Sequence, residues 1–158
     1  MLDKLTNSIK DAMRAKDKLR TQTLRSILND FTNAGIDKKG REGLTQEVAS
    51  PAEFLTSAEM IQVLQSAAKR RRESAEQYLA GHRQDLADKE NVELLILAEF
   101  LPQALSAVEL EVLIKETIAE IGATSMAEMG LVMKAAQPKI AGRADGKAIS
   151  AVVRELLG

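Results

Sequence analysis

Four consecutive cations form the strongest local charge feature of the sequence, the run KRRR at residues 69–72, and a further cation follows at Arg83. Side chains of this type can contact the phosphates of a nucleic acid and release the condensed counterions. The alternative is a solvated helix face balanced by Glu73 and Glu76. The candidate phosphate-binding residues of this segment are Lys69, Arg70, Arg71 and Arg83.

The last residue of the run, Arg72, is predicted to have a different role. At about 100° per residue it falls on the same side of a helix as the apolar residues Leu64 and Ala68. A guanidinium buried there needs a carboxylate partner. The following helix offers Glu90 and Glu93 on the side expected to face it. We therefore predict a structural ion pair between Arg72 and one of these two residues.

A second basic feature, PKIAGRADGKAIS at residues 138–150, surrounds a glycine-containing turn that leads into a helix. Lys139, Arg143 and Lys147 lie in or beside this turn, where the free amides and the dipole of a helix N-terminus also favour an anion. This pattern predicts a site for one phosphate. In the alternative interpretation, Asp145 caps the helix and the cations only keep the turn soluble.

The sequence contains no recognisable catalytic or metal-binding constellation. His82 is the only histidine and there is no cysteine, so a metal site or histidine-based acid–base catalysis would lack partners. No serine lies in a nucleophile-elbow motif. We therefore predict no catalytic residue, no metal and no cofactor.

The formal net charge of −1 hides a very uneven distribution of charge along the chain. Residues 1–35, 67–83 and 130–158 each carry +3, whereas residues 84–129 carry −8. Basic segments of this kind permit a polyanionic partner despite the overall balance. The lack of cysteine fits a reducing compartment, and no apolar run approaches the roughly 20 residues of a membrane span. These features predict a cytoplasmic protein without a membrane segment.

The composition favours helices packed on helices, since 45% of the 158 residues are apolar but only 3% are aromatic. Helical periodicity predicts one helix over residues 2–15 and a second over 18–34 that stops at Gly35. Residues 36–55 lose this period, and glycines and a proline interrupt them, so they are predicted to form a mobile loop.

A long helical hairpin is predicted after this loop. Its first helix begins at a capping box formed by Thr56 and Glu59, and its second ends before Pro102. The segment NVELLILAEFL, residues 91–101, is apolar nearly all round and is expected to be buried between other helices. An N-terminal helical domain is thus assigned to residues 1–103.

Residues 104–158 are predicted to form a small three-helix domain. Two capping-box sequences open helices over residues 107–121 and 126–137, the second of which ends at Pro138. A third helix begins after Asp145. The complete chain is therefore predicted to be all-α, without strands.

Three stretches together resemble the YqeY family: KRRRESAEQY, DLADKENVELLILAEFLPQALS and MGLVMKAAQPKIAGRADGKAISAVVRELL. The last stretch is also similar to the tail of GatB, the B subunit of the glutamine-dependent tRNA amidotransferase. The resemblance implies an N-terminal helical lobe, a GatB/YqeY-like three-helix lobe, and contact between that tail and tRNA. The residues that match the tail and would contact phosphates are Lys134, Lys139, Arg143 and Lys147.

The resemblance also implies the family label of carbon–nitrogen ligation with glutamine as the amide donor. That label belongs to a multisubunit enzyme whose phosphate-transfer and amidase groups have no counterpart in this sequence, so we do not expect this chain to catalyse alone. We expect a tRNA-binding accessory protein of translation that contacts the RNA backbone, with amidotransferase or aminoacyl-tRNA synthetase components as protein partners and no role for DNA. The alternative is a helical interaction module that docks on an enzyme or on the translation machinery.

Overall fold

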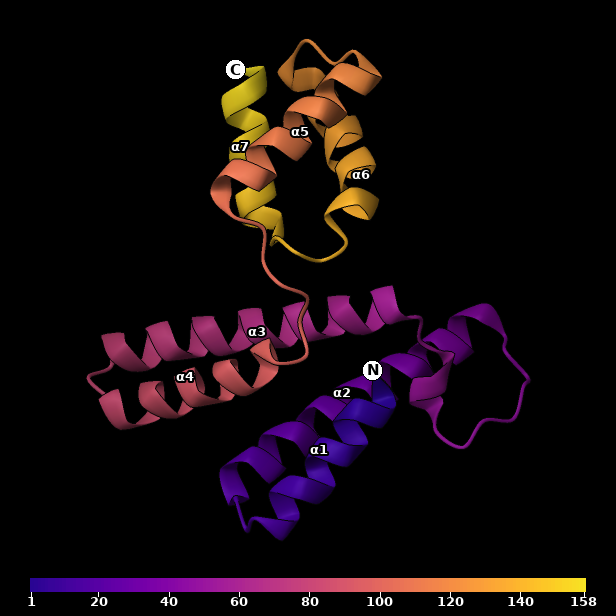
Figure 1. Ribbon diagram of the computed structural model, residues 1–158, viewed down its shortest axis with the longest axis vertical. Coiled ribbons are helices and arrows are strands. Elements are labelled where there is room, and N and C mark those ends of the chain that lie inside the picture. The colour runs from indigo at the N-terminus through magenta and orange to yellow at the C-terminus, as the bar shows by residue number, and fades with distance from the viewer. The chain divides into compact units, whose positions relative to one another are not determined.

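The computed structural model describes residues 1–158 and contains seven α-helices, two short 3-10 helices and no strand (Figure 1). The prediction of an all-α fold is confirmed. The chain divides into two compact units, Met1–Leu101 and Pro102–Gly158, which we call unit 1 and unit 2. Each unit has its own hydrophobic core. No helix is both long enough and apolar enough to cross a membrane.

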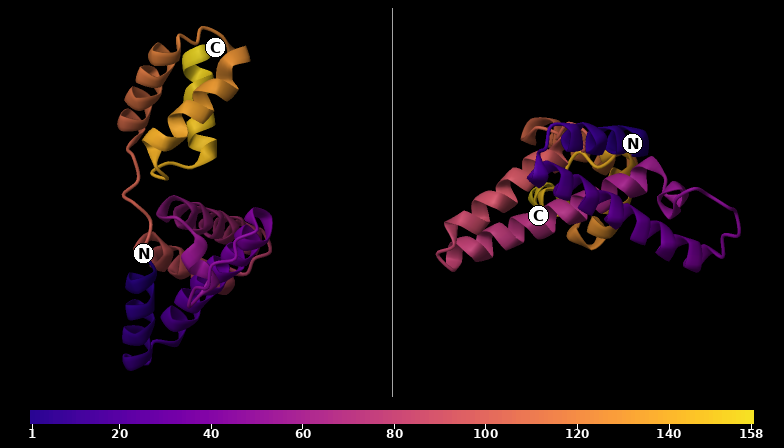
Figure 2. Two further views of the ribbon diagram at one scale, coloured as in Figure 1. Left: turned by 90° about the vertical axis from the view of Figure 1, so that its right-hand side faces the viewer. Right: turned by 90° about the horizontal axis from the view of Figure 1, so that it is seen from below.

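Unit 1 is built from two helical hairpins. Its α-helices are α1 (Leu2–Arg14), α2 (Lys18–Glu42), α3 (Ser57–Ala80) and α4 (Gln84–Ala98). The long helices α3 and α4 lie side by side, as the right panel of Figure 2 shows most clearly. Fully buried side chains from all four helices fill the core of unit 1, among them Leu5, Phe31, Leu64 and Leu97.

The predicted end of the second helix is wrong, because α2 continues through Gly35 to Glu42. Gly35 is buried, and a Cβ atom built on it would lie only 1.9 Å from the carbonyl oxygen of Pro51. Because Gly35 has no side chain, the 3-10 helix η1 (Pro51–Phe54) packs directly on α2 at this position. The glycine thus serves close packing and does not end the helix. The actual C-cap is Gly43, whose φ of 63° suits the left-handed conformation. Residues 36–42 of the expected loop are thus helical.

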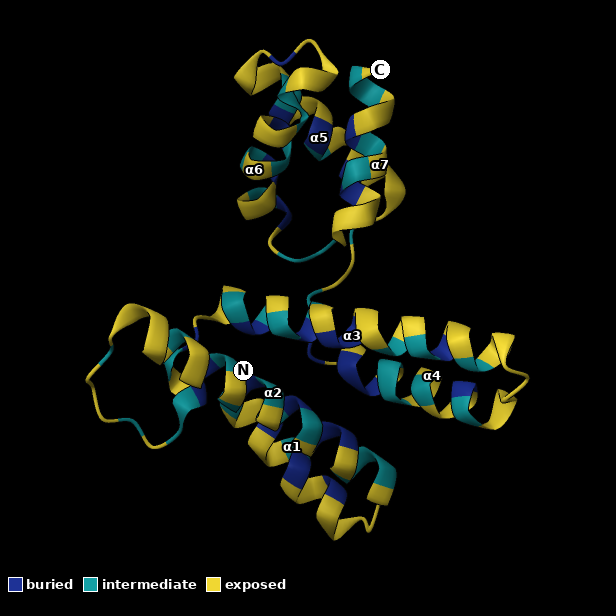
Figure 3. Cartoon of the chain, turned by 180° about the vertical axis from the view of Figure 1, so that it is seen from behind, coloured by how far each residue is buried: buried dark blue, intermediate teal, exposed yellow.

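The expectation that residues 91–101 are buried on all sides is also wrong. Leu97 is completely buried, but Val92 is 43% and Leu95 is 70% exposed. Alternating buried and exposed stripes are visible along α4 in Figure 3. The reason is that α4 packs on α3 and α2 with one face, and no other element of unit 1 covers its outer face.

Unit 2 is the predicted three-helix bundle. It consists of α5 (Ala107–Ile121), the 3-10 helix η2 (Met126–Glu128), α6 (Met129–Ile140) and α7 (Gly146–Leu157). The capping boxes at Ser106 and Ser125 are both formed, and the Asp145 carboxylate accepts a hydrogen bond from the backbone N–H of Ala148 at 2.7 Å. The three helices enclose a core of aliphatic side chains, among them Ile114, Val132, Ile140 and Val153.

Pro138 does not end its helix as predicted. The residue lies inside α6, which continues to Ile140 and is capped by Ala141 in the left-handed conformation. A proline here removes only one intrahelical hydrogen bond, at the amide that would have donated to Lys134. Ile140 is 1% exposed, so its burial in the core favours the additional turn.

Candidate nucleic-acid interface

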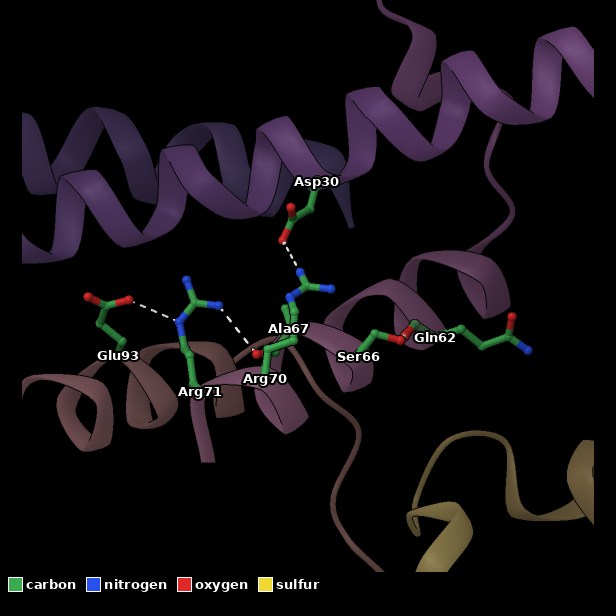
Figure 4. A network of polar contacts seen from close by, with 7 residues as sticks. All are labelled: Asp30, Gln62, Ser66, Ala67, Arg70, Arg71 and Glu93. Carbon is green, nitrogen blue, oxygen red and sulfur yellow. Dashed lines mark hydrogen bonds and ion pairs between the residues drawn. The ribbon is translucent and has the colours of Figure 1, made fainter. Parts of the chain in front are cut away.

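The cationic run on α3 is engaged by carboxylates within unit 1. Arg70 forms an ion pair with Asp30 of α2 at 3.1 Å, and Arg71 Nε donates to Glu93 of α4 at 2.9 Å (Figure 4). Lys69 approaches Glu73, one turn later on α3, at 3.8 Å. Two members of the run, Arg70 and Arg71, thus tie α3 to its neighbours α2 and α4.

Arg71 of α3 and Glu93 of α4 form an ion pair in which the two side chains are only 12% and 16% exposed. Arg72 is exposed, and its predicted ion pair with Glu90 or Glu93 stays a prediction. The predicted stripe residues Leu64 and Ala68 are buried, together with Ala67 and Ala75. Arg71 lies four residues after Ala67 and three after Ala68, and so on the same side of the helix.

Arg83 lies beyond the run, just before α4, and is held by Asp85. Its Nε and Nη2 atoms donate to the two carboxylate oxygens at 3.0 and 2.9 Å. The hydrogen bonds from Arg83 lower the pKa of the Asp85 carboxyl below its usual range. Because both side chains are more than half exposed, this pair is weak in water and contributes little to stability.

A groove of about 390 Å³ runs between α2 and α3. Ion pairs lie on both sides of it: the pair of Arg70 with Asp30, and the pair of Lys38 with Glu59 at 2.8 Å. The Lys38 ammonium and the Thr56 amide hold the pKa of the Glu59 carboxyl at about 2. The carboxylates along this groove make it a poor surface for phosphates. No group of three histidine or acidic side chains is arranged to hold a metal ion.

Two of the candidates in unit 2 make internal contacts. Lys139 of α6 forms an ion pair with Glu120 of α5. Arg143 folds back onto the end of α6, where its guanidinium donates to the carbonyl oxygens of Lys139 and Ile140, each at 3.3 Å. These cations therefore satisfy carbonyl and carboxylate groups of the fold, and no local sequence pattern indicates these partners.

Lys134 and Lys147 are exposed and are held by no carboxylate ion pair. Each lies two positions from a buried residue of its own helix, Val132 or Ile149, and so about 200° away from it around the helix axis. Both side chains therefore point away from the core. Arg154 is exposed seven residues after Lys147 and lies on the same face of α7. Sequence reasoning missed Arg154, although the seven-residue spacing was a usable signal.

Charge is separated within unit 2. Residues 102–128, which include α5, contain five glutamates and one lysine. Residues 129–158, which form α6 and α7, contain five cations and only two carboxylates. One of these carboxylates, Asp145, accepts from the N-terminal amides of α7, in the place that a bound phosphate would need. An anion is therefore expected on the outer faces of α6 and α7 and not at the turn between them.

Comparison with known proteins identifies the family to which this chain belongs. A family model described as Yqey-like protein matches residues 2–157. The chain belongs to the YqeY family. It is 30% identical over 108 residues to the altered inheritance of mitochondria protein 41, mitochondrial, of Lachancea thermotolerans, covering 68% of this chain and 51% of that protein. The protein of the same name in Kluyveromyces lactis is 29% identical over 96 residues, covering 61% and 45%.

This YqeY-family chain thus spans about half the length of the curated relatives it matches. Within it, the structure separates the predicted basic residues into two groups. The first is held by carboxylates or carbonyl groups of the fold and consists of Arg70, Arg71, Arg83, Lys139 and Arg143. The second is exposed and consists of Lys134, Lys147 and also Lys69, whose side chain is 72% exposed and lies 3.8 Å from Glu73. Arg154 joins Lys134 and Lys147 as a cation available to a partner.

Proposed function

We propose that this YqeY-family chain is a tRNA-binding accessory protein and that α6 and α7 contact the RNA backbone. The observation that carries the proposal is the separation of charge in unit 2, with five cations on α6, α7 and their connection beside an acidic α5. Phosphates bind to exposed cations and release counterions, whereas they are repelled from the glutamates of α5. Lys134, Lys147 and Arg154 are the residues expected to make these contacts.

Contact with the backbone is favoured over recognition of bases. Bases are usually held by stacking on aromatic side chains. All four aromatic residues of the chain lie in unit 1, so unit 2 has none to offer. The proposed contacts therefore read the charge and shape of a folded RNA, and a preference for one tRNA sequence is not expected from them.

The proposal assigns no catalytic step to this chain. Its place would be beside an enzyme such as an amidotransferase or an aminoacyl-tRNA synthetase, as the resemblance to the GatB tail implies. Cytoplasmic location stays a prediction, because the relatives compared above are named as mitochondrial proteins.

A titration with unmodified bulk tRNA at low and near-physiological salt tests the proposal. Each phosphate contact contributes roughly 0.7 to 0.9 to the slope of log affinity against log salt, so the triple variant Lys134→Gln, Lys147→Gln and Arg154→Gln should lower that slope by about 2. Its affinity at low salt is expected to fall by about tenfold or more. The matched control is the triple variant Arg41→Gln, Lys89→Gln and Lys115→Gln, which also removes three positive charges, but outside α6 and α7. The proposal fails if the wild-type chain does not bind at low salt or if both triple variants bind alike.

A second candidate function is the helical interaction module, and the exposed apolar side chains favour it. Val108 is 70% and Val112 is 50% exposed on the outer face of α5, and Leu131 of α6 is 62% exposed. Apolar side chains that remain exposed mark contact surfaces when they adjoin. Recovery of a protein partner after nuclease treatment, lost on Val108→Ser with Val112→Ser, would favour this function over RNA binding.

A further inference from the structure

The turn between α1 and α2 carries an exposed cationic surface. Residues 10–25 contain six cations and only two carboxylates. Five of these cations are exposed. They are Lys10, Arg14, Lys16, Lys18 and Arg25, and we call them the hairpin tip. The turn lies at the end of the hairpin that points away from α3 and α4 (Figures 1 and 2).

The two carboxylates near the hairpin tip do little to neutralise it. Asp17 caps α2, where its side chain accepts from the backbone N–H of Arg20 at 2.9 Å. Asp11 pairs with Arg14 at 3.2 Å, but both side chains are more than 70% exposed, so this pair is weak in water. The hairpin tip therefore keeps a positive excess, in contrast to Arg70 and Arg71 of the KRRR run, which pair with carboxylates of other helices.

The sixth cation, Arg20, holds the hairpin in place instead of facing a partner. Its guanidinium donates to both carboxylate oxygens of Glu99, beside the end of α4, at 2.6 and 2.7 Å. These hydrogen bonds lower the pKa of the Glu99 carboxyl below its usual range. The hairpin tip is thus attached to the rest of unit 1 by a two-pronged ion pair near its base.

The backbone of the turn itself contributes no free donors. The N–H groups of Ala15, Lys16 and Asp17 are bonded to the carbonyl oxygens of residues 11, 13 and 12. An anion at the hairpin tip is therefore expected to be bound mainly by the side chains. Flexible lysine and arginine side chains that project from a narrow turn suit a ligand with several spaced negative charges, such as the phosphates of a nucleic acid.

A lipid surface fits the hairpin tip less well than RNA. Membrane association through a basic segment is strengthened by apolar side chains that insert beside the cations. The hairpin tip offers only Met13, which is 51% exposed and whose sulfur lies 3.4 Å from the guanidinium of Arg25. Phosphates arranged along a polymer are therefore the better match to the observed chemistry.

We propose that the hairpin tip is a second RNA-contacting surface, which binds phosphates of the same tRNA through Lys10, Arg14, Lys16 and Lys18. This inference rests on the proposed tRNA-binding function. Once one of the two surfaces has bound an RNA that is long enough to reach both, the effective concentration of that RNA at the other surface is raised. The affinity of the complete chain should then exceed that of either surface alone.

The test compares three triple variants of the complete chain in titrations with bulk tRNA at several salt concentrations. The hairpin variant is Lys10→Gln, Arg14→Gln and Lys18→Gln, and it removes three positive charges, as each of the other two variants does. The α6–α7 variant and the control Arg41→Gln, Lys89→Gln and Lys115→Gln are those described above. The hairpin variant is expected to lose about tenfold in affinity at low salt and about 2 in the salt slope, relative to the control.

The outcomes separate the two proposals. If only the α6–α7 variant is weakened, the hairpin proposal is overturned and the proposed function stands. If only the hairpin variant is weakened, the hairpin proposal is supported and the role of α6 and α7 is overturned. Vesicles of anionic phospholipid serve as a second probe. If the hairpin variant loses more affinity for these vesicles than for tRNA, the assignment of the hairpin tip to RNA is also overturned. Unchanged thermal unfolding of each variant shows that the fold is intact.

Discussion

Replacing Gly35 with alanine is expected to destabilise unit 1 by about 3 kcal/mol. The new Cβ atom would lie 1.9 Å from the carbonyl oxygen of Pro51 and 2.4 Å from its carbon. Both atoms belong to the backbone, so no rotamer change can relieve the clash. Either η1 must leave the surface of α2, which exposes Ala52 and Leu55, or α2 must bend. Urea unfolding followed by circular dichroism measures the cost.

Gly40→Ala is the matched control for this experiment. Gly40 lies five residues later in the same helix, and a Cβ atom added there would meet nothing within 4 Å. Alanine is the better helix former, so this variant should gain up to about 1 kcal/mol. Equal stabilities of the two variants would show that η1 does not pack against Gly35 as described.

Breaking the ion pair between Arg71 and Glu93 is expected to have the second-largest effect. Arg71→Ala should cost roughly 2 kcal/mol, because it leaves the carboxylate of Glu93 only 16% exposed and without its guanidinium. The cost is set below that of a completely buried pair, since water still reaches both side chains. Chemical denaturation of Arg71→Ala, Glu93→Gln and the double variant gives the coupling between them.

Lys69→Ala provides the control for this pair, because Lys69 lies two residues before Arg71 on α3 and its side chain is 72% exposed. This substitution should change stability by no more than about 0.5 kcal/mol. A larger loss for Lys69→Ala than for Arg71→Ala would mean that the inward face of α3 has been assigned incorrectly. Absence of coupling between positions 71 and 93 would contradict the ion pair itself.

Local signals in the sequence predicted helix starts well. The capping boxes at Thr56 and Ser106, and the cap at Asp145, depend only on residues within three or four positions, and all three are formed. The role of Gly35 was not predictable in this way. It depends on Pro51, which is distant in sequence, and a glycine in a helical pattern is more often a stop than a site of close packing.

The candidate site was predictable only in part. The sequence identified Lys134 and Lys147 as cations, but not that Lys139 would pair with Glu120 of another helix. The sequence also could not reveal that Arg70 and Arg71 would be paired, since Asp30 and Glu93 reach them through tertiary packing. The direction in which each cation of α3 points was hard to predict, because a step of one residue along a helix turns the side chain by about 100°.

The central proposal, that α6 and α7 contact the backbone of tRNA, is tested most directly by lysine footprinting of the wild-type chain. Each lysine is acetylated briefly with and without saturating bulk tRNA at low salt, and its modification is measured by mass spectrometry. Lys134 and Lys147 are expected to be protected by tRNA, whereas Lys115, which lies on the acidic α5, should react at an unchanged rate. Unchanged acetylation of Lys134 and Lys147 while tRNA is bound would contradict the proposal.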